Sequence, residues 1–321
     1  MRKNRPSQTA ILIARSTYML SRDPDLSRLI PPGAGEACRR FLEAAGLPRR
    51  QLEMADRAWF RSFALFSERF AIPGVSLHYA ARKRWLEEAA RQALADGIAQ
   101  VVVLGAGLDT LALRLHRELP GVLFVETDHP ATQEVKRRAL ALWGELDANL
   151  KLAALDLAHA RPEEVLAALP EYRPEADALF IAEGLTMYLQ PEEMDAFFAF
   201  LRRHAGPGSR FAFTFMEPQA DGRVNFPSAT PLVRPWLALV GEPFTWGVRR
   251  QDLPRYLEER GFALTELAGA DELRQRYLAP AGLAERRLAV GEYLALARAL
   301  TPPNPLSPDP SLPPSPGERG L

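Results

Sequence analysis

Cysteine is almost absent from this chain of 321 residues, since Cys38 is the only one. A single cysteine excludes an intramolecular disulfide framework and any CxxC metal knuckle. The five histidines stand in no HExxH or paired-histidine spacing, so we predict no bound metal ion. Neither sign of charge predominates, because 40 Lys and Arg balance 40 Asp and Glu. This balance argues against a nucleic-acid partner, which normally requires a strongly basic surface.

Long apolar runs are also missing. The longest, such as Val101–Leu104 and Leu179–Ala182, fall far short of the roughly 20 residues that a membrane-spanning helix needs. The apolar stretch at residues 10–14 ends at Arg15 and is too short for the core of a signal peptide. We therefore expect no membrane association and a cytoplasmic location.

Proline is common but unevenly placed. Eight of the 28 prolines lie between Pro302 and Pro316, in a segment with almost no apolar residues to bury. Such a composition favours extended, solvated backbone. We predict a disordered proline-rich tail over residues 301–321; an untethered terminus is the simpler interpretation, and a proline-motif ligand for a partner is the alternative.

The hydrophobic pattern divides the rest of the chain in two. Residues 1–97 are mostly helical in pattern, and Ala80–Asp96 ends at Gly97, where a helix cap belongs. From residue 98 onward, short unbroken apolar runs indicate strands that are covered on both faces. These expected strands are Val101–Leu104, Val122–Val125, Leu152–Leu155, Ala178–Ala182, Phe211–Met216, Phe262–Leu267 and Arg287–Leu296. Helical stretches separate them at Thr110–Leu119, Ala131–Leu146, Pro162–Leu169, Glu192–His204 and Gln251–Arg260.

Strands that alternate with helices predict an α/β fold with a doubly wound, Rossmann-like sheet. We expect an N-terminal helical cap over residues 1–97 and a core domain over residues 98–300. Residues 218–249, rich in Pro and Trp, interrupt the alternation. We interpret them as an insertion that lies like a lid over the edge of the sheet.

Polar and glycine residues follow the expected strands, at the edge where open α/β sheets bind ligands. Any one of these carboxylates could be a helix cap or a solvated turn residue, but the set indicates a binding site. Its members, in strand order, are Gly105 and Gly107, Glu126 and Asp128, Asp156, Glu183, and Glu217.

The glycine pair suggests which ligand is bound. A dinucleotide fingerprint would place a third glycine where Thr110 stands. Asp109, before it, would repel a pyrophosphate at the start of the following helix. Asp128 suits a ribose diol, and Asp156 could accept a hydrogen bond from an adenine amine. These features favour a nucleoside without phosphates, S-adenosylmethionine, over NAD.

Longer motifs make a family resemblance specific. QVVVLGAGLDT (Gln100–Thr110), VETDHP (Val125–Pro130) and IAEGLTMYL (Ile181–Leu189) occur in order, followed by GEPF (Gly241–Phe244). With them, the sequence resembles the leucine carboxyl methyltransferase family, particularly its bacterial branch similar to polyketide O-methyltransferases. The resemblance spans roughly residues 7–293. One departure is Leu111, where bacterial members usually carry Arg.

The resemblance implies a class I methyltransferase fold, S-adenosylmethionine as cofactor and a small-molecule acceptor. It also implies roles for individual residues. Gly105 and Gly107 would let the backbone approach the methionine part of the cofactor, and Asp128 would bind the ribose. The remaining assignments place Asp156 and Leu157 at the adenine, Glu183 at the amino-acid end, and Arg82, with Arg15 as a weaker candidate, at the cofactor carboxylate.

The acceptor decides whether a general base is needed. A carboxylate (pKa about 4) is ionised at neutral pH, whereas a phenol or alcohol would gain from a base. No persuasive base pair is present, and His78, His129 and Tyr188 are weak candidates, so we assign no catalytic residue. The missing base favours a carboxylate, for which we expect a rate that is flat from about pH 6 to 8.5.

Two other functions stay open on the residues alone. A nicotinamide-dependent oxidoreductase shares the fold, but the chain lacks the third glycine and a YxxxK pair, since Glu192 stands four residues after Tyr188. A catalytically inactive nucleoside-binding module would have lost its site, whereas Gly105, Asp128 and Glu183 are intact. Both alternatives are weaker than methyl transfer.

Deleting Thr301–Leu321 should change neither the melting temperature nor cofactor binding, because the segment offers almost no apolar surface to bury. Differential scanning fluorimetry and calorimetric titration of the truncated chain provide the measurement. A fall of several degrees would show that the tail docks on the helical cap.

Overall fold

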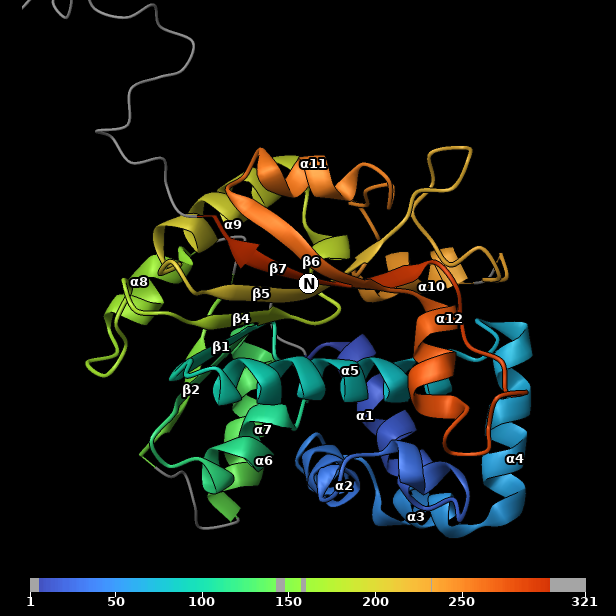
Figure 1. The fold of residues 1–321 in the computed structure, drawn as a ribbon. Coiled ribbons are helices and arrows are strands. Elements are labelled where there is room, and N and C mark those ends of the chain that lie inside the picture. Colours follow the sequence, from blue (N-terminus) through green and yellow to red (C-terminus); the bar gives the residue numbers. More distant parts are fainter. Residues whose placement is uncertain (1–5, 143–147, 157–159, 232, 301–321) are drawn as a thin grey trace, which may run out of the picture.

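A computed structural model describes residues 6–142, 148–156, 160–231 and 233–300 (Figure 1). Within these residues, no helix combines the length and the apolar character that crossing a membrane requires. The proline-rich tail and the end of the helix expected to reach Leu146 lie outside the described residues.

A seven-stranded sheet forms the centre of the molecule, in the order β3-β2-β1-β4-β5-β7-β6. Strands β1 to β5 are parallel, and β7 runs antiparallel between β5 and β6. The strand order reverses between β1 and β4, so the sheet has a switch point there. The strands are β1 (Gln100–Leu104), β2 (Leu123–Asp128), β3 (Leu150–Ala154), β4 (Leu179–Ala182), β5 (Arg210–Met216), β6 (Phe262–Ala268) and β7 (Glu292–Ala299).

Alternate residues of each central strand enter separate cores on the two faces of the sheet. Val101 and Val103 of β1 belong to one apolar cluster, and Val102 and Leu104 to another. Figure 1 shows helices α5, α6 and α7 on one face and α9 and α11 on the other. The unbroken apolar run of β1 is therefore explained by burial on both sides.

Helices of the N-terminal region and of the alternating region supply most of the side chains that pack against the sheet. The N-terminal ones are α1 (Gln8–Ser21), α2 (Ala34–Ala44), α3 (Arg49–Glu53), α4 (Ala58–Ser67) and α5 (Val75–Ala95). Those that cover the sheet farther along the chain are α6 (Leu111–Glu118), α7 (Pro130–Leu142), α9 (Pro191–Arg203) and α11 (Leu253–Glu258). The other α-helices in the described residues are α8 (Pro162–Ala167), α10 (Val233–Val240) and α12 (Ala270–Leu273).

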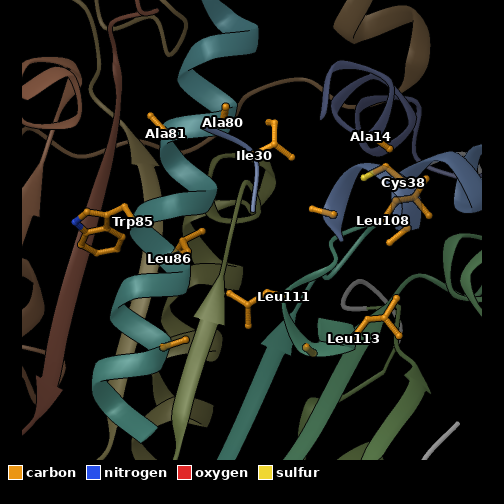
Figure 2. Packing of buried hydrophobic residues seen from close by; sticks show 14 of the residues in the cluster. Ala14, Ile30, Cys38, Ala80, Ala81, Trp85, Leu86, Leu108, Leu111 and Leu113 are labelled. Atoms are coloured by element: carbon orange, nitrogen blue, oxygen red, sulfur yellow. The ribbon is translucent and has the colours of Figure 1, made fainter. Parts of the chain in front are cut away.

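The N-terminal helices share their core with the sheet. Figure 2 shows Trp85 and Leu86 of α5, Cys38 of α2 and Ala14 of α1 within one cluster of buried side chains, together with Leu108 from the loop after β1. Continuous packing of this kind means that the helical region and the sheet exclude water together.

The doubly wound sheet is confirmed, with shifts of a few residues in strand boundaries. The largest shift affects the last strand, expected over Arg287–Leu296 and found as β7 at Glu292–Ala299. The insertion at 218–249 is less irregular than its composition indicated. It contains helix α10 and an isolated bridge between Pro218 and Val224.

Replacing Phe198 of α9 with Ala should lower the free energy of unfolding by about 3–5 kcal/mol. The side chain is 1% exposed and its ring contacts those of Phe211, Phe213 and Phe262. Phe63→Ala on α4 is the matched control, because that ring is 61% exposed and should change stability by less than about 0.5 kcal/mol. Urea denaturation of both variants measures the difference; equal effects would contradict the assignment of Phe198 to the core.

Candidate active site

A cavity of about 390 Å³ lies where the ends of β1, β2 and β4 meet helices α1 and α5. Its wall also includes residues 241–243 and 245, which follow α10 in the insertion. The position agrees with the rule that ligands bind beyond the carboxyl ends of strands at the switch point. The lining includes six of the seven cofactor-binding residues expected from the sequence: Arg82, Gly105, Gly107, Asp128, Asp156 and Glu183.

The glycine loop after β1 forms the floor of the cavity. Gly105 and Gly107 have φ of +66° and +53°, in the left-handed region that side chains rarely adopt. A Cβ at Gly105 would lie 2.9 Å from Leu185 Cδ1, and one at Gly107 would lie 3.2 Å from Ala10 Cβ. Both positions therefore favour glycine through their backbone conformation, and a side chain at either would also push against its neighbour.

Asp128 holds this loop and also faces the cavity. Its Oδ2 accepts a hydrogen bond from the Gly107 N–H at 2.6 Å. Its Oδ1 is buried and has no hydrogen-bond partner among the described residues. Burial raises the pKa of this carboxyl, although the Gly107 N–H acts in the opposite direction. The His129 N–H and the Thr132 hydroxyl also favour the ionised form of this carboxyl.

Asp156, which follows strand β3, lines the cavity and is half-buried. Its Oδ2 lies 3.7 Å from His129 Nε2. The His129 Nδ1 accepts a hydrogen bond from the Ala131 N–H, at the start of α7. This contact supports a structural role for His129. Leu157 lies outside the described residues.

Glu183, after β4, is enclosed by cations from α5. Arg82 Nη2 and Lys83 Nζ lie 2.8 Å and 3.1 Å from its Oε1. Lys83 also lies 2.6 Å from Asp109, and Arg82 lies 2.7 Å from Glu292 at the start of β7. The group thus ties α5, the glycine loop, β4 and β7 together.

The ionisation of these acids follows from their neighbours. Burial by itself disfavours ionised Glu292, but Arg82 and His78 outweigh it and lower the pKa of Glu292 to about 2. For Asp109, burial is likewise outweighed, mainly by Lys83, and the pKa falls well below its ordinary value. Both carboxylates are therefore ionised across the physiological range.

Several expected site residues lie elsewhere. Arg15 is exposed on α1 and does not line the cavity. Glu126 does not line it either, because it lies within β2 and is fully buried beside Lys136 of α7, with Oε2 and Nζ 2.5 Å apart. Glu217 instead accepts a hydrogen bond from the Arg250 backbone N–H. His78 is fully buried against Glu292, at 2.9 Å, and is not part of the cavity wall.

Residues from distant segments complete the wall, and the strand-end argument did not identify them. Glu242, 6% exposed, accepts hydrogen bonds from both the backbone N–H and the hydroxyl of Thr9. Tyr188, from the 3-10 turn η4 (Thr186–Tyr188), lies beside them, with its ring 5.4 Å from that of Phe244. The GEPF motif was the available signal for Glu242, but sequence alone assigned it no partner.

Comparisons with known proteins identify the family to which the chain belongs. The chain matches the leucine carboxyl methyltransferase family over residues 14–202. A protein of Frankia alni with the provisional name S-adenosyl-L-methionine-dependent methyltransferase is 31% identical over 229 residues, which cover 68% of this chain and 73% of that protein. A protein of Mycobacteroides abscessus with the same provisional name is 28% identical, covering 83% and 86% of the two chains.

Two solved structures share the architecture. One is from Thermobifida fusca and is provisionally named a methyltransferase; its TM-score is 0.52 at 19% identity, covering 82% of this chain and 94% of that one. The other, a DUF574 family protein of Streptomyces avermitilis, has a TM-score of 0.53 at 19% identity, covering 82% and 97%. The fold is the Rossmann-like fold of class I S-adenosylmethionine-dependent methyltransferases.

The Glu292 contacts generate a pH prediction. Its folded-state pKa of about 2 lies below the ordinary value of 4.5, so ionised Glu292 stabilises the fold above pH 4.5, and this contribution is lost as the pH falls toward 2. Relative to the parent, Glu292→Gln should be less stable near pH 7 by up to about 3 kcal/mol, with a shallower loss of stability between pH 4.5 and 2. Urea midpoints across this range measure both effects, with exposed Glu258→Gln as control. Parallel stability curves would show that Glu292 is not the titrating group.

Proposed function

The chain belongs to the leucine carboxyl methyltransferase family and is an S-adenosylmethionine-dependent methyltransferase; we propose that it methylates a carboxylate or hydroxyl oxygen of a small molecule, such as a secondary metabolite. The observation that supports this assignment most strongly is the cavity at the switch point of the sheet, where Asp128 comes together with Gly105, Gly107 and Glu183.

Asp128 and the glycine loop fit the nucleoside half of the cofactor. A ribose hydroxyl could donate to the Asp128 carboxylate, whose Oδ2 also accepts a hydrogen bond from the Gly107 N–H. We assign the neighbouring Asp156 to accept a hydrogen bond from the adenine amine, and Leu157 to the apolar side of that contact. Because Gly105 has no side chain, ligand atoms can approach the backbone closely.

Arg82, Glu183 and Asp109 fit the amino-acid half. In its ion pairs Arg82 uses Nε, Nη1 and Nη2. Since a guanidinium carries five N–H groups, one on each Nη remains to bind a carboxylate. Glu183 and Asp109 supply the negative charge that an ammonium group requires. The pairs within the protein hold these groups in place before any ligand arrives.

When bound, S-adenosylmethionine supplies a methyl group that its sulfonium sulfur has already activated. The protein therefore has to hold donor and acceptor in line and exclude water, which is catalysis by proximity. The Thr9–Glu242 hydrogen bonds connect α1 to the insertion across the cavity and support a covering role for residues 218–249.

The two alternative functions are less compatible with the site. In an oxidoreductase the N-terminus of α6 would receive a pyrophosphate, but here Asp109 Oδ2 accepts from the Leu111 N–H at 3.0 Å and places a negative charge there. An inactive module would not need to keep Asp128 and Glu183 together in one cavity. We further propose a helical cap at 1–97, a catalytic domain at 98–300 and a cytoplasmic location.

Asp128→Ala should weaken S-adenosylmethionine binding by about 1–3 kcal/mol, because a charge-assisted hydrogen bond to the ribose is lost. Isothermal titration calorimetry measures the Kd, and Asp221→Ala, in an exposed loop, is the matched control. Circular dichroism checks that the fold persists.

An unchanged Kd for Asp128→Ala would reduce Asp128 to a turn residue and remove the main support for this cofactor site. Asp128→Asn separates the effect of charge from that of shape. Its amide oxygen can still accept the hydrogen bond from the Gly107 N–H, but the side chain carries no charge.

A further inference from the structure

The charges that line the cavity are strongly unequal. Its described wall contains six carboxylates but only two permanent cations, Arg82 and Lys83. The six are Asp109, Asp128, Asp156, Glu183, Glu193 and Glu242. The chain as a whole has no net charge, so this excess is a local property of the site.

Both cations are already engaged by acids. Arg82 lies between Glu183 and Glu292, and Lys83 lies between Asp109 and Glu183. The proposed function assigns the N–H groups of Arg82 that these acids do not use to the cofactor carboxylate. Among the described wall residues, no other Lys or Arg is present to neutralise a second anion.

No cofactor role is assigned to the part of the wall that is formed by η4 and the residues after α10. Glu242 is its charged residue and is nine-tenths buried. Its two hydrogen bonds within the described chain both end on Oε2, from the Thr9 N–H and hydroxyl. Oε1 is therefore the oxygen left to accept from a ligand.

Tyr188 adds no positive charge to this wall. Burial raises the pKa of its phenol, and nearby Tyr79 and Glu242 raise it further. At neutral pH the side chain is a neutral hydroxyl. A ligand that enters here meets a hydrogen-bonding hydroxyl and a buried carboxylate.

We propose that the methyl acceptor carries no negative charge at the reacting end and presents a hydroxyl donor to Glu242, which makes Glu242 a specificity-determining residue. This inference rests on the proposed function and narrows it from carboxylate or hydroxyl to hydroxyl. It departs from the carboxylate favoured by the lack of a base in the sequence.

The physical reason is the cost of burying like charges together. A carboxylate acceptor next to Glu242 would lose hydration and meet repulsion from that carboxylate, while the wall offers no Lys or Arg beyond the engaged Arg82 and Lys83, so the cofactor's sulfonium would have to offset both losses. A hydroxyl would instead donate a charge-assisted hydrogen bond to Oε1, which is stronger than a bond between neutral groups. When its oxygen bonds to the methyl carbon and the carbon–sulfur bond of the donor breaks, the hydroxyl proton would pass to Oε1.

A reporter thiol measures this discrimination without a known acceptor. Pro243→Cys places the thiol on the exposed rim beside Glu242, and Leu12→Cys, 46% exposed on the outer side of α1, provides a surface reference. Native Cys38 is 1% exposed, and burial raises its pKa to about 12, so it should stay unreactive in both variants. Each variant is treated with the cationic trimethylammonioethyl and the anionic sulfonatoethyl methanethiosulfonate, with and without S-adenosylhomocysteine.

We expect the ratio of cationic to anionic modification rates at Pro243→Cys to exceed that at Leu12→Cys by roughly tenfold at low salt. The excess should shrink at high salt, because screening weakens charge–charge interactions. Adding Glu242→Gln should reduce the excess by roughly threefold, while adding Glu258→Gln, on exposed α11, should leave it unchanged.

Equal ratios at the two thiols, or faster entry of the anionic reagent, would overturn the proposal. If the excess of cationic over anionic modification is unchanged by Glu242→Gln, Glu242 is not the residue that determines which charge the cavity admits. Binding of S-adenosylhomocysteine, measured by calorimetry, is independent of these ratios. Its absence would refute the proposed function, while the thiol rates recorded without it would still decide which charge the cavity admits.

Discussion

The ion pairs of Arg82 connect parts of the molecule that are far apart in the chain. The guanidinium, 3% exposed on α5, binds Glu183 at the end of β4 and Glu292 at the start of β7. Removing one partner of such a buried group leaves an uncompensated charge, at a cost of about 3–5 kcal/mol. The position of Glu183 in the cavity, and the attachment of the helical region to the centre of the sheet, both depend on this arrangement.

Buried carboxylates at the cavity are held in place by hydrogen bonds from other parts of the chain. Oδ2 of Asp128 accepts a hydrogen bond from the Gly107 N–H of the glycine loop. Oε2 of Glu242 likewise accepts the hydrogen bonds from the Thr9 N–H and hydroxyl. Each carboxylate is thereby fixed in orientation before a ligand binds, which lowers the entropy that binding costs.

The acidic character of the cavity suits a cationic cofactor and constrains its second ligand. A sulfonium donor and its ammonium group are stabilised by surrounding carboxylates, but an anionic acceptor meets the same carboxylates as repulsion. Family membership therefore establishes methyl transfer, while the balance of charges in the wall bears on the kind of oxygen that receives it. The insertion matters here because it contributes Glu242 and Pro243 to that wall.

The sequence alone was sufficient for the sheet and for the residues at its edge. Strands buried on both faces must be apolar throughout, and parallel strands end at one edge, so Gly105, Asp128 and Glu183 could be placed in one site. It could not reveal that Glu126, three residues from His129, turns into the interior toward Lys136. Nor could it pair Arg82 with Glu292 or Thr9 with Glu242, which lie 210 and 233 residues apart. Such contacts carry no periodic signal along the chain, because only the packing of complete elements brings the two side chains together.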